Sequence, residues 1–317
     1  MKNKLVSKTR KAIRKLKPQR KFFYDNAPIE NTIFVAGAAR SGTTWLQNII
    51  NYSFDYRVMF EPFHSGKVSL VKHFNFRQYL QPDNRDSNFL EPTRAILAGK
   101  IRNTWVDDFN TNFYVQKRVI KDVRTNLMLK WINRNFPFIP IVLIVRHPCP
   151  VAVSRRERGF DTHLDSYLSQ DLLMQDHLSE FRSLIENTSS LFEKHILIWC
   201  IEHYVLLRQF DQGDLHVLFY EDLCINPYDE VSRLFSFLDF EYNKNSTQLK
   251  NSIYMPSPLS RKKSAVVENR DLINDWKNHI TDKELDSALN MLKMFGLDVV
   301  YSEEAMPVCK DTNQLFK

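Results

Sequence analysis

The stretch that decides the fold runs from residue 33 to residue 46 and reads Ile33-Phe34-Val35-Ala36-Gly37-Ala38-Ala39-Arg40-Ser41-Gly42-Thr43-Thr44-Trp45-Leu46. A short apolar run comes first, a polar turn with a glycine follows, and an amphipathic run continues towards Asn51. This order predicts a buried strand, a tight loop and a helix. A loop that opens onto a helix N-terminus presents unpaired backbone N–H groups and the positive end of the helix dipole, where phosphate groups bind.

The two glycines of this loop have the spacing of a P-loop. Between Gly37 and Gly42 the pattern is G-x-x-x-x-G, but Thr43 and Thr44 follow where a nucleotide triphosphatase has Lys and Ser or Thr. The cation of the loop is Arg40, inside the turn. The loop is therefore expected to bind phosphate without the usual lysine and with less need for magnesium. The glycine spacing alone also fits an ordinary strand-to-helix turn.

Charge is distributed unevenly along the 317 residues, of which 43% are apolar. The net charge is +7, and ten of the 44 basic residues lie in residues 1–24, which contain no acid. The rest of the chain has 34 basic and 37 acidic residues, so a nucleic-acid-binding surface is not expected. We expect the basic arm to be solvated and partly disordered. The alternative is peripheral contact with an anionic membrane through residues 1–21.

The cysteines indicate a reducing compartment. They are far apart and follow no metal or redox spacing: Cys149, Cys200, Cys224 and Cys309. We expect a cytoplasmic protein, since no run is long enough for a transmembrane helix and the N-terminus lacks an apolar signal core. The expected organisation is the basic arm over 1–24, one domain over 25–305 and a tail over 306–317.

Strand and helix signals alternate from Thr32 onwards. They predict an α/β fold with a single P-loop-like domain, in which helices flank a central parallel sheet of about five strands. The expected strands are 32–36, 57–60, 115–120, 141–145 and 215–219. The expected helices are 43–52, 125–135, 150–157, 166–186, 189–210 and 227–238. The less regular residues 63–113 are expected to form a lid or a wall of the binding site.

Four of the predicted strands run into polar or charged residues. These are Glu61, Lys121-Asp122, Arg146-His147 and Tyr220-Glu221-Asp222, and the fifth strand ends in the phosphate loop. Ligands of open α/β sheets bind beyond the carboxyl ends of the strands. The sequence therefore predicts one site that combines these clusters with the loop.

A second phosphate-binding motif follows the apolar strand at 141–145. Arg146 stands at its tip, and Pro150 suits the first turn of the next helix, which places Ser154 one to two turns along that helix. A guanidinium and a hydroxyl in this arrangement can hold a phosphate by charge-assisted hydrogen bonds. A surface ion pair is the alternative for Arg146 taken alone.

The two motifs together resemble those of sulfotransferases that use 3′-phosphoadenosine 5′-phosphosulfate (PAPS). Residues 40–46 resemble the loop that binds the 5′-phosphosulfate, and Arg146 followed by Ser154 resembles the 3′-phosphate motif. Both stand in the family's order, and the resemblance covers roughly residues 30–300. It implies PAPS as co-substrate and adenosine 3′,5′-bisphosphate as product.

The resemblance also implies nucleotide-binding roles for particular residues. In the loop these are Arg40, Ser41, Gly42, Thr43 and Thr44. Trp45 is expected to stack on adenine and Tyr220 to lie near the nucleotide. The basic stretch 257–264 resembles the loop that closes over PAPS, with Ser260, Arg261 and Lys262 as candidate phosphate ligands. A core tryptophan and a solvated basic loop are the plainer alternatives, and the glycines usual before Asp275-Trp276-Lys277-Asn278 are absent.

Sulfuryl transfer needs an in-line attack, stabilised charge on the leaving oxygen, and a base for the acceptor proton. Arg40 and Lys121 are the expected cations. Cytosolic members of the family have a catalytic histidine two residues after this lysine, where Val123 stands here. We therefore expect Glu61 to be the general base, with a pKa raised by its apolar neighbours, and His64 to be the reserve. A loop-capping role is the alternative for Glu61. The sequence shows no metal-ligand cluster, so no metal is expected.

These observations predict transfer of a sulfuryl group from PAPS to a hydroxyl or amine. Tyrosylprotein and carbohydrate sulfotransferases resemble this chain in having a glutamate downstream of the Arg-Ser-Gly loop. The expected acceptor is accordingly a carbohydrate, a glycolipid or another small molecule. One alternative is a P-loop kinase or nucleotide-binding module, which would have a lysine after Gly42. Another is a non-catalytic, membrane-associated protein that binds adenosine 3′,5′-bisphosphate. The identity of the acceptor and the oligomeric state stay open.

Overall fold

A five-stranded parallel sheet forms the centre of the molecule, in the order β3-β5-β2-β6-β7. The computed structural model describes residues 24–110, 114–255, 268, 271–309 and 311–316. The strands are β2 (Thr32–Ala36), β3 (Tyr56–Phe60), β5 (Lys117–Lys121), β6 (Ile141–Val145) and β7 (His216–Phe219). The predicted α/β class and the central parallel sheet of five strands are confirmed. A second, unpredicted sheet pairs the two-residue strands β1 (Tyr24–Asp25) and β4 (Tyr114–Val115).

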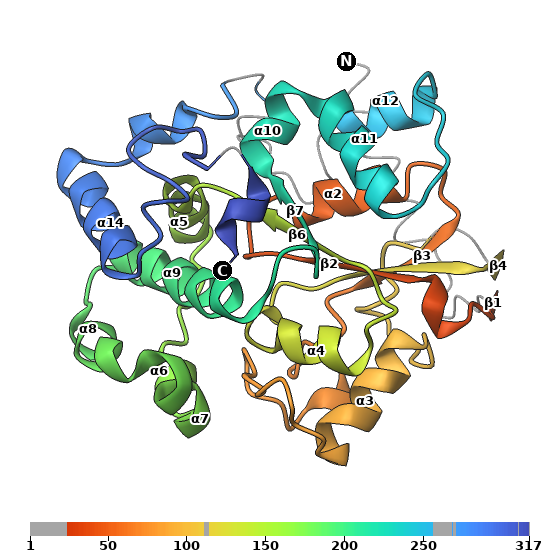
Figure 1. Cartoon of the computed structure of the whole chain (residues 1–317), viewed down its shortest axis with the longest axis horizontal. Coiled ribbons are helices and arrows are strands. Elements are labelled where there is room, and N and C mark those ends of the chain that lie inside the picture. The colour runs from red at the N-terminus through yellow and green to blue at the C-terminus, as the bar shows by residue number, and fades with distance from the viewer. Residues whose placement is uncertain (1–23, 111–113, 256–267, 269–270, 310, 317) are drawn as a thin grey trace.

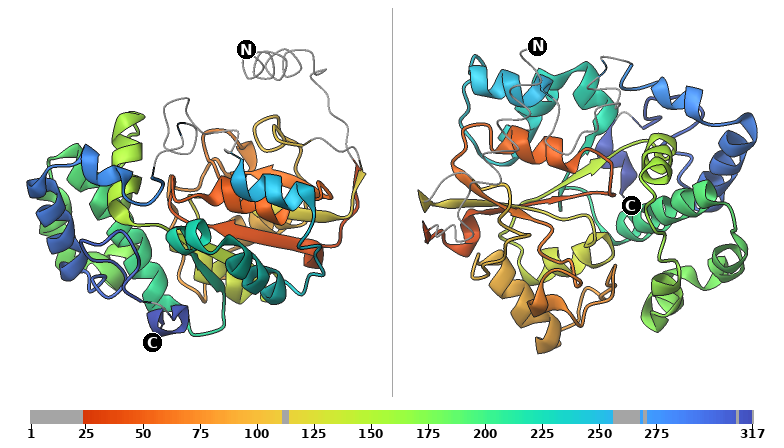
Figure 2. Two further views of the ribbon diagram at one scale, coloured as in Figure 1. Left: turned by 90° about the horizontal axis from the view of Figure 1, so that it is seen from above. Right: turned by 180° about the vertical axis from the view of Figure 1, so that it is seen from behind.

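Helices cover both faces of the sheet, as Figures 1 and 2 show. On one face lie α2 (Thr43–Ile50), α11 (Pro227–Phe237) and α12 (Thr247–Tyr254), and on the other lie α3 (Ser87–Leu97) and α4 (Leu129–Asn135). The alternation of side chains along β2 explains the two cores. Val35 packs in the core beneath α2, whereas Phe34 packs in the larger core on the opposite face.

The remaining helices extend the larger core beyond β6. They are α5 (Pro148–Glu157), α9 (Leu191–Gln209) and α14 (Asp282–Met294), with α10 (Tyr220–Ile225) following β7. Helix α9 lies along α5 and α14 (Figure 1). Helix α5 begins two residues before its predicted start at Pro150, because the side chain of His147 accepts a hydrogen bond from the backbone N–H of Cys149 at 3.2 Å. Short 3₁₀ segments lie at Ile29–Asn31, Ser69–Val71, Asn126–Met128, Asp275–His279 and Thr312–Leu315.

The long helix predicted over 166–186 is wrong. The chain instead forms α6 (Asp165–Leu168), α7 (Asp171–Leu173), a π-helical turn (Met174–Leu178), a 3₁₀ turn (Ser179–Phe181) and α8 (Arg182–Asn187). The break falls at Gln170, whose backbone is extended. Its amide side chain donates to the carbonyl of Arg77 at 2.9 Å and accepts from the N–H of Tyr79 at 2.7 Å. These bonds to a distant segment hold Gln170 out of a helix.

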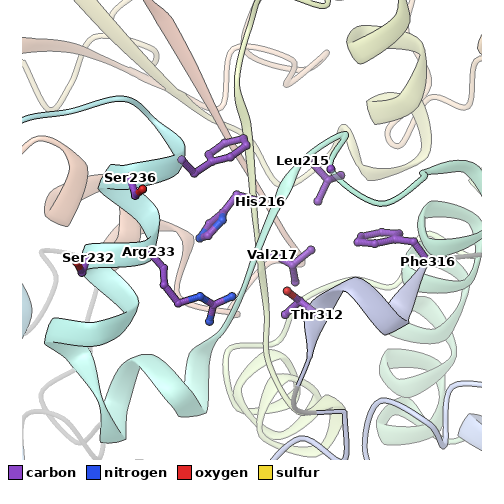
Figure 3. A pocket seen from close by; sticks show the side chains of 10 residues that line it. Leu215, His216, Val217, Ser232, Arg233, Ser236, Thr312 and Phe316 are labelled. Atoms are coloured by element: carbon purple, nitrogen blue, oxygen red, sulfur yellow. The ribbon is translucent and has the colours of Figure 1, made fainter.

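A cavity of about 560 Å³ opens beside the amino end of β7 (Figure 3). His216 and Val217 line it from β7, Leu215 from the residue before the strand, Arg233 from α11, and Phe316 from the C-terminal segment. The predicted site belongs to the opposite, carboxyl ends of the strands, so this cavity is not part of it. No helix in the described part of the chain is both long and apolar enough to cross a membrane.

Candidate active site

Two glycines allow the phosphate loop to pack tightly between β6 and α10. Gly37 has φ +148° and Gly42 has φ +100°, a backbone region that favours glycine. A Cβ on Gly37 would lie 2.5 Å from the carbonyl oxygen of Ile144, and one on Gly42 would lie 2.8 Å from Cδ2 of Tyr220. The loop can therefore approach strand β6 and Tyr220 this closely only with glycine at both positions.

Arg40 joins the loop to the second predicted phosphate motif. Its φ of 82° is in the left-handed region. A residue other than glycine is strained in this conformation, and residues strained in this way are found mainly at functional sites. Its Nε donates a hydrogen bond to Oγ of Ser154 at 3.0 Å. Its carbonyl oxygen accepts one from Nη1 of Arg146 at 3.3 Å. The structure thus brings together the three residues that the sequence assigned to the two phosphate groups.

The first turn of α2 completes the loop. Gly42 is the N-cap of α2. The backbone N–H groups of Thr43 and Thr44 belong to the first turn, where the helix has no carbonyl that could accept their hydrogen bonds. Both threonine side chains are buried. The hydroxyl of Ser41 is already used within the loop, since it donates to the carbonyl of Ala38 at 2.7 Å. The loop therefore offers an anion the backbone N–H groups as hydrogen-bond donors, together with the positive end of the α2 dipole.

Aromatic rings lie beside Arg146 and the first turn of α2. The guanidinium carbon of Arg146 is 3.9 Å from the centre of the Tyr220 ring, and Tyr220 meets Trp45 edge to face at 5.5 Å. The indole N–H of Trp45 donates to the carbonyls of Ser252 and Ile253 in α12, at 3.1 and 2.9 Å. Trp45 is thus held by α2, α10 and α12 at the mouth of the loop, and it is half-buried.

Glu61 lies at the end of β3 between two cations. Its own φ is 46°, and its N–H donates to the carbonyl of Lys121 at 2.7 Å. Nζ of Lys121 donates to one carboxylate oxygen at 2.6 Å, and Arg124 donates to the other. Burial by itself raises the pKa of this carboxyl, but Lys121 and Arg124 together lower it to about 2. The expected raised pKa is therefore wrong for this state of the protein, because two cations outweigh the apolar neighbours.

Asp122 fixes the turn that carries Glu61. Its fully buried carboxylate accepts hydrogen bonds from the N–H of Phe63 at 2.9 Å and from the N–H of Arg124 at 2.8 Å. Burial raises its pKa to about 6. Arg124 was missed by sequence reasoning. The available signal was a second basic residue just beyond the strand that ends at Lys121.

His64 is the reserve candidate for the general base. Burial, with a contribution from Arg124, lowers the pKa of His64 to about 4, and its ring meets Trp105 edge to face at 5.5 Å. Val123 is buried in the protein interior.

Ser260, Arg261 and Lys262 lie outside the described residues. Within the described ranges, no group of His, Cys, Asp and Glu side chains could hold a metal ion.

The comparisons with known proteins agree with the motifs. The family described as "Sulfotransferase domain" matches residues 30–293. No curated protein sequence matches the chain. Among solved structures, the sulfotransferase domain from the curacin biosynthetic pathway is 14% identical, covering 86% of this chain and 99% of its own, with a TM-score of 0.44.

Two further solved structures have similar values. Mouse sulfotransferase SULT7A1, complexed with PAP, is 17% identical over 84% of both chains, with a TM-score of 0.41. Sulfotransferase STF9 from Mycobacterium avium is 10% identical over 89% of this chain and 79% of its own, with a TM-score of 0.46. Since the family match spans most of the chain, this protein belongs to the sulfotransferase family and is a sulfotransferase. The resemblance identified from the two phosphate motifs is confirmed.

Proposed function

We propose that this sulfotransferase binds PAPS across the phosphate loop and the start of α5. The observation that carries the proposal is the contact of Arg40 with both Ser154 and Arg146, which makes one cationic surface from two motifs. Glycine at positions 37 and 42 keeps the loop packed closely on β6 and Tyr220, at the N-terminus of α2. An anion there would meet backbone N–H groups, a helix dipole and guanidinium groups.

Different residues of this site stabilise the leaving group and accept the proton. When bound, PAPS supplies a sulfuryl group for transfer to an acceptor oxygen or nitrogen, and adenosine 3′,5′-bisphosphate leaves. Arg40 and Lys121 provide positive charge for the leaving phosphate oxygen. Glu61 takes the proton that the acceptor group loses, and it lies next to Lys121.

The low pKa of Glu61 is compatible with this role. A carboxylate with a pKa near 2 is ionised at neutral pH and so is able to accept a proton, although it is a weak base. Its basicity depends on two cationic partners. When Lys121 donates to a phosphate oxygen instead, Glu61 keeps Arg124 as its cationic partner, and the pKa of Glu61 rises.

We propose a hydroxylated acceptor with a ring, such as a carbohydrate or glycolipid. The support is an aromatic group beside Glu61, in which the rings of Phe60 and Trp105 meet at 5.2 Å and Trp105 also contacts His64. Trp105 is partly exposed, whereas Phe60 is buried, and a partly exposed aromatic face with a few polar groups is typical of small-molecule sites. We propose that the segment 63–110, which includes Trp105, lines this side of the site.

We further propose that the protein acts in the cytoplasm as one catalytic domain over residues 25–305. Support comes from the separated, unpaired cysteines of the sequence, all four of which are free thiols. The ten basic residues of the N-terminal arm would attract this domain to an anionic membrane surface.

Isothermal titration with adenosine 3′,5′-bisphosphate tests the nucleotide site, and a screen of acceptors with ³⁵S-labelled PAPS tests the acceptor class. We expect binding without added metal, and labelling of hydroxylated carbohydrates or glycolipids. Tight binding of ATP with magnesium, without binding of the bisphosphate, would contradict the proposal and favour a P-loop kinase. Labelling confined to an acceptor without a ring would contradict the acceptor class alone.

A further inference from the structure

A buried charge cluster lies behind the phosphate loop. It consists of Arg155 on α5, Glu202 on α9 and Arg77 from the segment before α3, and all three residues are less than 9% exposed. Arg77 forms a direct ion pair with Glu202. Arg155 is farther away, with its Nη2 at 4.0 Å from the nearer carboxylate oxygen of Glu202. Helices α5 and α9, which carry two of the three residues, run side by side (Figures 1 and 2).

The cluster has two cations and one anion. The carboxylate of Glu202 also accepts hydrogen bonds from Tyr167 at 3.2 Å and from Asn126 at 3.1 Å. Most of its capacity to accept hydrogen bonds is therefore used. Among the described residues, neither Nη1 nor Nη2 of Arg155 has a hydrogen-bond partner. A buried charge without full compensation costs free energy unless another charge offsets it.

The positive potential also acts on a neighbouring group. His195 on α9 is 1% exposed. Burial, followed by the charges of Arg155 and Arg77, lowers its pKa to about 4. His195 is therefore neutral at pH 7 and adds no further charge. Asp161 faces the same histidine but is exposed, so it offsets little of the charge of the cluster.

Arg155 contacts the phosphate loop directly. Its Nε donates a hydrogen bond to the carbonyl oxygen of Ala39 at 3.1 Å. The next carbonyl, that of Arg40, accepts from Arg146 at 3.3 Å. Two consecutive loop carbonyls are therefore held by guanidinium groups from the β6–α5 segment, at the point where Arg40 adopts φ 82°.

We propose that Arg155 is a positioning residue for the cofactor loop, and that its incompletely compensated buried charge is offset when the phosphosulfate group of PAPS binds. The proposal rests on the nucleotide site proposed above. It assigns to Arg155 a role that acts through the loop, since both terminal nitrogens are buried and donate to no described group. The cation disfavours the ligand-free protein and favours the complex.

The experiment compares R155M, R155K and R156M as full-length proteins. Arg156 is the matched control: it is the next residue on α5, but it points to Glu284 at 2.6 Å and is paired there. We measure the ligand-free melting temperature by calorimetry and the affinity for adenosine 3′,5′-bisphosphate by titration. R155M is expected to melt at or above the wild-type temperature and to bind at least about tenfold more weakly. R155K, which keeps the charge, is expected to recover most of the affinity, and R156M is expected to bind like wild type.

Two results would overturn the inference. One is an R155M protein that binds the bisphosphate within about twofold of wild-type affinity. The other is an R155M protein that fails to fold or melts well below wild type, because Arg155 would then serve the fold itself. The melting comparison needs no nucleotide, so an R155M protein that melts well below wild type overturns the inference even when wild type shows no binding heat. That absence of heat would contradict the proposed function instead.

Discussion

Nε of Arg40 donates a hydrogen bond to Oγ of Ser154 at 3.0 Å, although the two residues are 114 positions apart in the sequence. One belongs to the loop after β2 and the other to α5. Because β2 and β6 are hydrogen-bonded neighbours, the segments that follow them leave the sheet side by side. Parallel pairing of two strands therefore assembles one cationic surface from two separate motifs.

Replacement of Arg146 tests this surface. R146A removes a guanidinium that holds the carbonyl of Arg40 and lies on the Tyr220 ring. We expect the affinity for adenosine 3′,5′-bisphosphate to fall by about 1.5–3 kcal/mol, the contribution of a hydrogen bond to a charged group. Calorimetric titration measures it. R233A, on α11 beside the amino end of β7, is the control and should bind normally. Unchanged affinity in R146A would remove Arg146 from the site.

Replacement of Glu61 tests the proposed base. E61Q keeps the shape of the side chain but cannot take a proton, so turnover is expected to fall by about 10²–10⁴-fold while nucleotide affinity is retained. E241Q changes an exposed glutamate and serves as the control. Steady-state rates with ³⁵S-labelled PAPS, together with titration of the nucleotide, separate the two effects. A rate near that of wild type would assign the base to another residue, whereas a wild type without turnover would indicate a protein that binds the nucleotide without catalysis.

Glu61 also predicts a pH dependence of stability. Lys121 and Arg124 lower the folded-state pKa of Glu61 to about 2, below its ordinary value of 4.5. Its ion pairs therefore stabilise the fold fully above about pH 4.5, and this contribution is lost as the pH falls through about 2. The pKa difference corresponds to about 3 kcal/mol. Urea unfolding from pH 7 to pH 3 should show that wild type and E61Q converge in free energy as the pH falls. A constant difference would contradict the pairing.

Gly42 tests the close packing of the loop. In G42A the new Cβ would lie 2.8 Å from Tyr220, at a φ of +100°. We expect a loss of about 1–3 kcal/mol in the free energy of unfolding, with weaker nucleotide binding. G213A is the matched control, since Gly213 also has a positive φ of +89° but no atom within 4 Å of the position that a Cβ would take. Equal unfolding free energies for the two variants would show that contact with Tyr220 is not limiting.

Deletion of residues 2–21 tests the basic arm. The truncated protein is expected to melt like the full chain and to lose binding to vesicles that contain phosphatidylserine, since each lysine or arginine near such a surface contributes about 1 kcal/mol. Co-sedimentation at low and physiological salt measures the binding, and neutral phosphatidylcholine vesicles are the control. Undiminished binding by the truncated protein would exclude the arm as the membrane contact.

Local patterns predicted the parts of the site that lie close together in sequence. The glycines at 37 and 42, the apolar run of β2 and the spacing from Arg146 to Ser154 each depend on one strand, one turn or one helix. Backbone geometry within such a unit is set by its own residues, so the motif alone places them. The family could be identified from the sequence for the same reason.

Contacts between distant segments decided the rest. Gln170 ends a helix because its side chain bonds the backbone of Arg77 and Tyr79, and hydrophobic periodicity carries no information on such a partner. The sequence by itself determined the sheet, the loop and the presence of a carboxylate at Glu61. Only the tertiary structure decided that Lys121 and Arg124 face that carboxylate, and a pKa depends on charges through space, wherever they stand in the chain.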